Sequence, residues 1–439
     1  MPNPVMPRRP KRRDRIVVYI IQAGSMHSSG KDSPISPARA WTVAFLLFIA
    51  GFINYLDRAI VSVALPVIAL DLHLGPAAKG VLLSAFFWSY ALMQLPMGWA
   101  ADRLNLRWFY TGAFALWSLA CGFTGFAATL GALMFMRVIL GIGESVYMPG
   151  GMKIVSILFG PKDRGLASGL MNCGTRAGLA LGAPAIAFLV HNFGWHKSFF
   201  ILGFGSVFWL VPWLAITPRG LKSSAATPAP SLSRTLARLD RNLLGMCLGH
   251  IGYGYYWYLL VTWLPDYLVE SRHMTLERAG AAAALPFLVF AVSEPLGGWI
   301  ADRLVSFGFS ERRSRKAVIT FAFFTSVMLL VAGRTAGDAA AVLMIASASL
   351  VGLATGNLYA LLASVAPEGE VGMWSGFLNF AGNISGVVAP VVTGLLIERT
   401  GSHYPGFVVA VVVLNLALPA YWWMVGEKKP ASAEVPAHA

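Results

Sequence analysis

The most constraining feature of the chain is a succession of long apolar segments. A segment of about 20 mostly apolar residues can cross a bilayer as a helix, and the 439-residue sequence holds twelve candidates. Hydrophobic residues make up 56% of the chain and charged residues 12%, which excludes an ordinary soluble globule and an intrinsically disordered protein. We therefore expect an all-α integral membrane protein with transmembrane helices near residues 41–65, 80–100, 108–128, 131–158, 165–190, 198–217, 243–264, 279–301, 317–334, 339–364, 372–397 and 405–425.

The segments outside these spans suggest two six-helix bundles. Residues 218–241 are rich in Pro, Ser and Ala with scattered Arg, which indicates a linker. The apolar stretch in residues 1–25 is too short for a signal peptide, so this segment is a basic tail or lies upstream of a true start at Met26, and we favour the second. The expected order is a cytoplasmic basic tail, an N-terminal bundle, a cytoplasmic linker, a C-terminal bundle and a cytoplasmic tail: 1–40, 41–217, 218–241, 242–425 and 426–439.

The basic residues indicate how the chain is oriented in the membrane. The formal net charge is +14, which could suggest a nucleic-acid partner. If the N-terminus is inside, however, the predicted cytoplasmic tails and loops hold 24 Lys and Arg and the opposite loops hold 6. Cytoplasmic loops of membrane proteins carry such an excess. We therefore expect both termini in the cytoplasm, a lipid bilayer as the surroundings and no nucleic-acid partner.

Two sequence echoes indicate an internal repeat. GWAADRLNLR begins at Gly98 and GWIADRLVSFGFSERR at Gly298, while GLMN at Gly169 is echoed by GFLN at Gly376. Two echoes at nearly the same offset indicate duplicated halves. In the first pair, Gly would permit close backbone approach and Asp would cap or pair with a helix end. We interpret both stretches as gating loops, with a rigid loop staple as the alternative; their residues are Gly98, Asp102, Arg103, Arg107, Gly298, Asp302 and Arg303.

These motifs resemble a known transporter family. GWAADRLNLR resembles the loop 2–3 signature of the major facilitator superfamily, and NYLDRAIVSVALP (54–66) and RVILGIGESVYMP (137–149) resemble signatures of its anion:cation symporter family. The resemblance spans residues 40–425 and includes WLPDYL and FLNFAGNISGVVAPVVTG. It implies the major facilitator fold of two pseudo-symmetric six-helix bundles, alternating access, a location in the inner (plasma) membrane and a monomer. The bacterial members that the chain resembles carry galactonate, glucarate, galactarate or hexuronates.

Ionisable residues inside the predicted spans are candidate functional groups, because each costs about 2.5–3.5 kcal/mol at the bilayer centre unless it is paired or faces water. Asp57 and Arg58 are neighbours and point about 100° apart on a helix, so one can face a cavity and the other a second helix. Arg137 and Glu144 are two turns apart and share a face. These four residues can form a set that stays neutral while one acid takes up a proton, or a purely structural ion-pair network. The resemblance implies that Asp57 and Glu144 are proton sites, that Arg137 controls Glu144, and that Arg58 binds the substrate carboxylate.

Three more charged residues lie within the spans. Arg176 departs from the resembling family, whose members tend to have an apolar residue there. It could contact a second carboxylate of the substrate, which would suit a dicarboxylate, or it could pair with Glu294. Both interpretations stay open. Lys153 lies nearer a helix end, where its side chain can snorkel to the interface.

Neutral polar side chains complete the predicted substrate site. SAFFWSY (84–90) and YGYYWYLLVTW (253–263) are rich in aromatic residues, and most Tyr and Trp of the chain are expected in interfacial belts or in packing. By resemblance, Tyr90 hydrogen-bonds the substrate and Asn379 lines the cavity. Asn383 shares a face with Asn379, and Tyr55 is a weaker candidate. A polyhydroxylated acid needs such neutral donors and acceptors beside a cation.

No enzymatic constellation is found. The sequence has no G-x-x-x-x-G-K-[ST] phosphate loop and no His pair at zinc-binding spacing, and Cys121, Cys173 and Cys247 are interpreted as core residues. We expect no enzyme, no cofactor and no metal. The predicted function is proton-coupled uptake of a small organic anion, such as a sugar acid, powered by the proton gradient.

Three alternatives remain at this stage. A drug or metabolite exporter working by proton antiport is disfavoured, because the spans hold four cations and three acids. A carrier of an aromatic or other monocarboxylic acid is compatible with the same residues. A membrane-embedded sensor that has lost transport would bind its ligand without flux.

Overall fold

A computed structural model of the protein describes residues 35–221, 240–366 and 371–426, and every regular element in these ranges is a helix. The question of the start at Met26, most of both predicted tails and most of the predicted linker lie outside the described residues. In chain order the elements are α2 Pro37–Asp71, α3 Pro76–Arg103, α4 Leu106–Thr124, α5 Leu130–Glu144, α6 Tyr147–Leu158, α7 Pro161–Ser206, η2 Val207–Trp209, α8 Leu210–Ile216, α10 Arg241–Asp266, η3 Tyr267–Ser271, α11 Leu276–Ser306, α12 Glu311–Thr325, α13 Met328–Arg334, α14 Asp338–Ala348, η4 Ser349–Gly352, α15 Leu353–Val365, α16 Val371–Thr400, α17 Tyr404–Leu416 and η5 Ala420–Met424.

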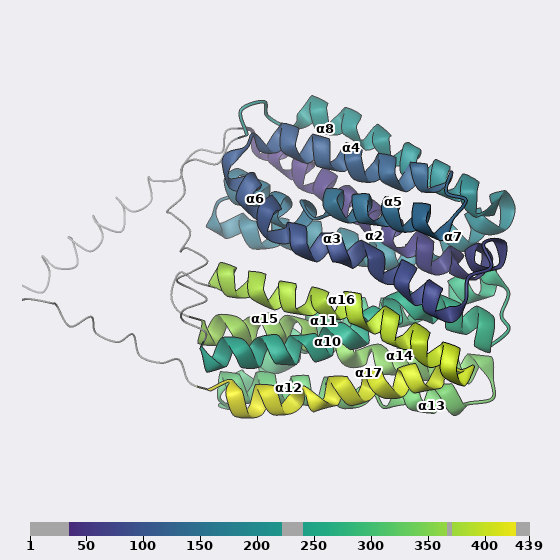
Figure 1. Ribbon diagram of the computed structural model, residues 1–439. Helices are drawn as coiled ribbons and strands as arrows, with labels where there is room; N and C mark the ends of the chain where they lie inside the picture. Colours follow the sequence, from purple (N-terminus) through teal and green to yellow (C-terminus); the bar gives the residue numbers. More distant parts are fainter. Residues whose placement is uncertain (1–34, 222–239, 367–370, 427–439) are drawn as a thin grey trace, which may run out of the picture.

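The helices form two groups that lie side by side (Figure 1). In the first, Pro37–Ile216, α2 packs on α7 and α5 packs on α3 and α4. In the second, Arg241–Met424, α10 packs on α16 and α17, while α15 packs on α11 and α12. We call these groups the N-terminal half and the C-terminal half; the domain boundaries drawn from the sequence stay predictions. The halves meet mainly where α3 packs on α16 and α7 packs on α11.

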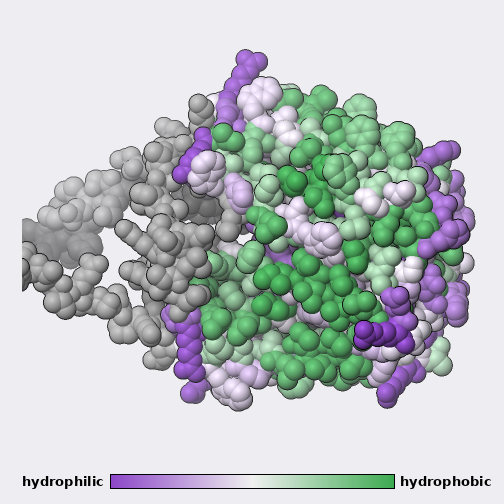
Figure 2. Space-filling model, viewed as in Figure 1, coloured by the Kyte–Doolittle hydropathy of each residue, from purple (hydrophilic) through white to green (hydrophobic). Residues whose placement is uncertain are grey.

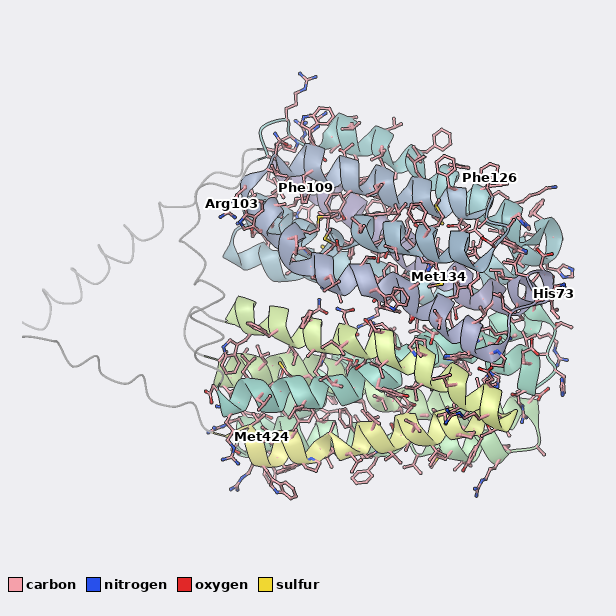
Figure 3. The ribbon with its side chains drawn as sticks, in the orientation of Figure 1. His73, Arg103, Phe109, Phe126, Met134 and Met424 are labelled. Carbon is pink, nitrogen blue, oxygen red and sulfur yellow. The ribbon has the colours of Figure 1, made fainter. Side chains whose placement is uncertain are left out.

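The molecule has two distinct ends. The described chain starts and finishes at one end, which we call the tail end, and the loop that joins α2 to α3 lies at the opposite end, which we call the far end. Figure 3 labels Arg103 at the tail end and His73 at the far end of the same half. Between them, hydrophobic side chains cover most of the visible surface and hydrophilic side chains gather at the two ends (Figure 2). This distribution is typical of a protein whose flank faces lipid.

The helical runs agree with the predicted spans in place, but the count of twelve transmembrane helices stays a prediction. Within the described residues, eight helices are long and apolar enough to cross a membrane. Helices α3, α4 and α10 overlap three further predicted spans and are not among the eight. One 50-residue run, Ala167–Ile216, overlaps two predicted spans. It is divided by Gly194, whose φ of 77° is non-helical.

Local sequence signals explain where the helices begin. Asn105, Thr129 and Asp240 each accept a hydrogen bond from a backbone N–H of the first turn that follows, which satisfies donors that a helix N-terminus leaves unpaired. Helices α2, α3 and α7 begin with proline, which needs no such partner. The span predicted at 131–158 is divided into α5 and α6 directly after Glu144.

Glycines on α7 bring it close to α2. Gly174 lies against the backbone of Phe48 and Gly178 against that of Phe52, so a Cβ at either glycine would overlap the neighbouring helix. Small residues at a helix–helix contact allow such close approach within a membrane. The contact also fixes the register of α2 against α7, and with it the relative height of the side chains further along.

Candidate functional site

A buried ion pair joins α2 to α5 in the N-terminal half. Arg58 Nε donates to Glu144 Oε2 at 2.7 Å, and their side chains are 9% and 0% exposed. Asn54, one turn before Arg58, is fully buried beside Glu144. Removing one partner would leave a buried charge uncompensated, which is costly, so the two residues can separate only if another group replaces the one that leaves.

Aromatic rings surround the guanidinium of Arg58. Its Cζ lies 5.0 Å from the ring centroid of Tyr55, 4.6 Å from that of Phe86 and 4.4 Å from that of Tyr90. Each distance is within the range of a cation–π contact. The rings hold the cation in place without competing for all of its hydrogen-bond donors, because an arginine has five.

Asp57 points away from its neighbour Arg58, toward α4. Its Oδ1 accepts a hydrogen bond from Cys121 Sγ at 3.2 Å, and the side chain is 1% exposed. Arg137 Nη1 donates to the backbone oxygen of Asp57 at 3.0 Å. Both Arg137 and Glu144 of α5 thus form hydrogen bonds with α2. The structure brings Asp57 and Arg58 of α2 together with Arg137 and Glu144 of α5.

A cavity between the two halves contains Arg58. From the N-terminal half it is lined by Tyr55, Arg58, Ser62 and Arg137 with two apolar side chains of α3, and from the C-terminal half by Trp257, Tyr258, Val261 and Thr262 of α10. Ser62 Oγ donates to the backbone oxygens of Val261 and Thr262 at 2.9 and 2.7 Å. Arginine, hydroxyl groups and rings are the kinds of groups that recognise a small organic anion, but the space that they enclose is only about 20 Å³, so the halves must separate before such a molecule can enter.

Helix α10 contributes side chains to this cavity that were not among the residues selected from the sequence. Trp257 and Tyr258 belong to the run YGYYWYLLVTW, and neither was named as a candidate for the substrate site. Tyr258 Oη donates to Asn383 Oδ1 at 2.7 Å. The available signal was the position of Tyr258 near the middle of its apolar run, well away from either interface.

The two predicted asparagines of α16 behave differently. Asn383 is buried, and its side chain is used within the protein: Nδ2 donates to the backbone oxygen of Asn379 at 2.8 Å, while Oδ1 accepts from Tyr258. Asn379 is partly buried one turn nearer the tail end. Neither asparagine lines the cavity itself. Asn383 lies behind Tyr258 and orients its hydroxyl.

A second ion pair connects the two halves. Arg176 Nη2 on α7 lies 2.8 Å from Glu294 Oε2 on α11, and the side chains are 25% and 30% exposed. Of the two interpretations left open by the sequence, the pairing with Glu294 is present. Lys153 is partly buried on α6.

The predicted gating stretches make contacts within their own halves. Arg103 stacks on Trp99 of its own helix, and Arg107 Nη2 donates to the backbone oxygen of Leu214 at 2.6 Å. In the C-terminal half, Asp302 Oδ1 pairs with Arg315 Nη2 at 3.2 Å, and Arg303 lies over the ring of Phe307. The side chain of Asp102 lies outside the described residues.

Two structural expectations from the sequence are wrong. A Cβ at Gly98 would meet only an ordinary contact at 3.8 Å, and one at Gly298 would meet open space, so neither glycine is needed for close backbone approach. Of the cysteines assigned to the core, Cys121 is buried, but Cys173 is exposed and Cys247 only partly buried. Apolar flanks do not place a cysteine inside when the surface of the protein is itself apolar.

Charged residues also close the far end between the halves. Lys79 Nζ of α3 lies 2.9 Å from Asp266 Oδ1 at the end of α10 and 3.6 Å from Glu270 Oε1. His403 contacts Asp266 Oδ2 through Nε2 at 3.0 Å and Ser271 Oγ through Nδ1 at 2.8 Å. We call these five residues the far-end cluster. Burial alone would raise the pKa of Asp266, but the hydrogen bond from His403 and the charge of Lys79 hold that pKa below its ordinary value.

Known proteins match this chain over most of its length. The model of the Major Facilitator Superfamily matches residues 47–358 and 308–439. The D-galactonate transporter of Escherichia coli O6:H1 is 30% identical, with coverage of 91% of this chain and 99% of the relative. A probable galactarate/D-glucarate transporter of Bacillus subtilis is 29% identical, with coverage of 89% and 92%.

A solved structure shares the fold. The bacterial homolog to the human lysosomal transporter Spinster, in an inward-facing and unoccupied conformation, superposes with a TM-score of 0.76 at 19% identity, covering 89% of this chain and 98% of that one. The family match, the relatives and the helical architecture agree with one another. The chain belongs to the Major Facilitator Superfamily and is a multi-pass membrane transporter rather than an enzyme.

Proposed function

We propose that the protein imports a small organic anion together with protons, and that the anion is a sugar acid such as galactonate, galactarate, glucarate or a hexuronate. The observation that carries this proposal is the buried pair of Arg58 and Glu144 at the cavity between the halves. The names of the relatives support the class of substrate. The proton gradient would supply the energy, with no cofactor.

The pair provides a direct link between proton and anion. When Glu144 takes up a proton it loses its charge, and Arg58 is left without a counter-ion. A substrate carboxylate can then replace Glu144 as the partner of the guanidinium, because Arg–carboxylate pairs are strong and specific in geometry. Substrate and proton thus bind together and leave together, since an unpaired buried charge is costly in either intermediate.

Asp57 and Arg137 are the supporting residues in this proposal. Asp57 is a second buried acid that can accept a proton, and its Oδ1 already contacts Cys121. Arg137 acts on both acids, through its hydrogen bond to the backbone of Asp57 and through its charge near Glu144. The competing possibility is that the network only holds α2, α4 and α5 together, and this predicts lost stability without altered coupling.

Neutral side chains would recognise the hydroxyl groups of the substrate. Tyr55 and Tyr258 line the cavity, Tyr90 lies against Arg58, and Asn379 and Asn383 lie behind on α16. We place the tail end in the cytoplasm of the inner membrane, with the protein acting as a monomer. The halves would then alternate access by separating at the far end and closing at the tail end, where the gating stretches lie.

An aromatic carboxylic acid is the second candidate substrate. The rings of Tyr55, Phe87, Trp257 and Tyr258 all line the cavity. Such rings stack well on an aromatic substrate and also serve the apolar faces of sugars. The two candidates are separated by the same uptake experiment.

Uptake into membrane vesicles tests the proposal. We expect labelled galactonate to accumulate when the pH is lower on the far-end side, and accumulation to stop when a protonophore removes the gradient. Glu144→Gln should abolish gradient-driven accumulation while the variant still exchanges labelled for unlabelled substrate. Glu277→Gln, which changes an exposed acid of α11, is the matched control and should transport normally.

Three results would contradict parts of the proposal. Gradient-driven accumulation by Glu144→Gln would exclude Glu144 as the coupling residue. Uptake that ignores the proton gradient would exclude proton symport. Uptake of a benzoate-type acid in place of galactonate would select the second candidate substrate.

A further inference from the structure

The pair of Arg176 and Glu294 differs from the pair of Arg58 and Glu144 in its exposure and in its position. Arg58 and Glu144 belong to one half and are nearly inaccessible. Arg176 and Glu294 come from opposite halves, and both side chains are accessible to between a quarter and a third. A partly accessible pair between two bodies can exchange one carboxylate for another at a lower cost than a fully buried pair.

Both arginines face the same region. Trp257 lines the cavity with Arg58, and its ring also lies 5.3 Å from the Cζ of Arg176. The phenol of Tyr55 lies close enough to interact electrostatically with both guanidinium groups. Arg58 and Arg176 therefore border the same region, beside Tyr55 and Trp257.

The register of α2 and α7 gives the separation of these two sites. Because Gly174 packs on Phe48 and Gly178 on Phe52, Arg176 lies level with the stretch of α2 midway between those two residues. That point is about eight residues before Arg58, or roughly 12 Å along the helix axis. This rise is the offset between the two backbone levels, and with the reach of two arginine side chains an extended six-carbon diacid can pair with a guanidinium group at each end.

We infer that Arg176 is a second carboxylate site, and that it selects substrates with an acidic group at each end. In the empty protein Glu294 holds the position that the distal carboxylate of the substrate takes, as Glu144 does at Arg58. The inference rests on the proposed function and narrows it to dicarboxylates. The alternative is that the pair only holds the two halves together and does not discriminate between acids.

Galactarate and galactonate form a matched pair of probes. They share one carbon skeleton and differ at C6, which is a carboxylate in galactarate and a CH₂OH group in galactonate. At pH 7.5 every carboxylate in the two compounds is ionised. A side chain that recognises the distal carboxylate must therefore affect the binding of galactarate and leave that of galactonate almost unchanged.

Calorimetric titration of the purified full-length protein gives the readout. We expect the wild type to bind galactarate at least 10-fold more tightly than galactonate. Arg176→Met keeps an unbranched side chain against Trp257 and Phe290, and should weaken galactarate by about 10- to 100-fold and galactonate by less than about 3-fold. Glu294→Gln removes the competing carboxylate and should strengthen galactarate alone. Arg278→Met, an exposed cation on α11, is the control and should change neither affinity.

The outcomes separate this inference from the function on which it rests. Equal losses of affinity for both acids in Arg176→Met would show that the pair only holds the halves together, and would overturn the inference. No gain in affinity for galactarate in Glu294→Gln would have the same meaning. Wild-type binding of galactonate that equals or exceeds that of galactarate would also overturn it and leave the proposed function standing. If neither acid binds to the wild type, the sugar-acid function fails together with the inference.

Discussion

The two halves share one helical layout but bring different chemistry to the cavity between them. The N-terminal half supplies both members of the buried pair, Arg58 and Glu144, and two further cations, Arg137 and Arg176. The C-terminal half supplies neutral groups, led by Tyr258 and its partner Asn383, and a single partly exposed acid. The same helical layout thus provides mainly charged groups in the N-terminal half and mainly neutral hydrogen-bonding groups in the C-terminal half.

Equivalent positions make this difference explicit. The 200-residue offset of the two gating stretches, applied to α2 and α10, pairs Arg58 with Tyr258 and Ser62 with Thr262. Ser62 donates to the backbone of Thr262, so these equivalent positions meet where the helices cross. His73 and His273, also 200 residues apart, have the same left-handed backbone conformation, with φ of 53° and 54°. The backbone repeat is preserved in detail where the side chains at the cavity have diverged.

The largest effect is expected from removing the charge of the N-terminal half. Arg58→Leu leaves Glu144 buried without a counter-ion, so stability should fall by about 3–5 kcal/mol, and uptake should fall to background because the substrate carboxylate loses its partner. Thermal unfolding and vesicle uptake measure the two effects separately.

A double variant separates stability from function. Arg58→Leu combined with Glu144→Gln contains no uncompensated charge at this site, so it should recover most of the stability and none of the uptake. Uptake by the double variant would mean that the carboxylate binds elsewhere and that the asymmetry of the halves has no role in recognition.

The charged residues of the N-terminal half can be predicted well from the sequence. Asp57, Arg58, Arg137 and Glu144 could be selected because an ionisable residue in an apolar span is rare and costly, and the structure brings the four together. The helical runs could be predicted for the same reason, since the membrane requires long apolar segments.

The neutral groups that the C-terminal half brings to the cavity could not be predicted in the same way. A tyrosine such as Tyr258 has the same composition signal whether it lies in a belt, in the core or at a cavity, and only the crossing of α2 and α10 assigns it to the cavity. The contact of Lys79 with Asp266 joins residues 187 positions apart, and nothing local marks either residue as a partner. The prediction of close backbone approach at Gly98 and Gly298 failed for a related reason. A repeated motif can be kept because the fold requires it, without a close contact at each glycine.

A smaller effect is expected from Tyr258, which holds the position equivalent to Arg58 in the C-terminal half. Tyr258→Phe removes the hydroxyl that donates to Asn383 and leaves a buried acceptor, a change of about 1–1.5 kcal/mol. The KM for a sugar acid should rise by about 5- to 10-fold, while the ratio of protons to anions stays the same because no charge is altered.

Another tyrosine of α10 provides the control. Tyr256 donates to the backbone oxygen of Ala348 at 3.0 Å, within the C-terminal half and away from the cavity. Tyr256→Phe should lower the melting temperature without changing KM. A changed proton ratio in Tyr258→Phe would show that the C-terminal half takes part in coupling, and the division of roles between the halves would then be wrong.

The smallest effect is expected in the far-end cluster, to which the N-terminal half contributes Lys79 and the C-terminal half the other four residues. Lys79→Met removes the ion pairs that link the halves in this cluster, while His403, from the same half as Asp266, still contacts that carboxylate. Because α3 still packs on α16 and α7 on α11, opening of the far end should become only about 5-fold more frequent. Hydrogen exchange should rise in peptides from the starts of α3 and α17 and stay constant at the tail end, whereas Lys197→Met, an exposed far-end lysine of α7, should change neither.

The pH dependence of this contact follows from the lowered pKa of Asp266. A carboxylate whose pKa is lowered in the closed arrangement stabilises that arrangement at any pH above its ordinary value of 3.8, and the stabilisation is lost only as the pH falls through the lowered value. The far end should thus stay equally closed between pH 7 and pH 5.5 once the intrinsic exchange rates are corrected, even if Glu144 exchanges protons over the transport cycle as proposed. A far end that opens over this range would mean that a group of the cluster other than Asp266 responds to pH, and proton sensing would then be shared between the cavity and the far end.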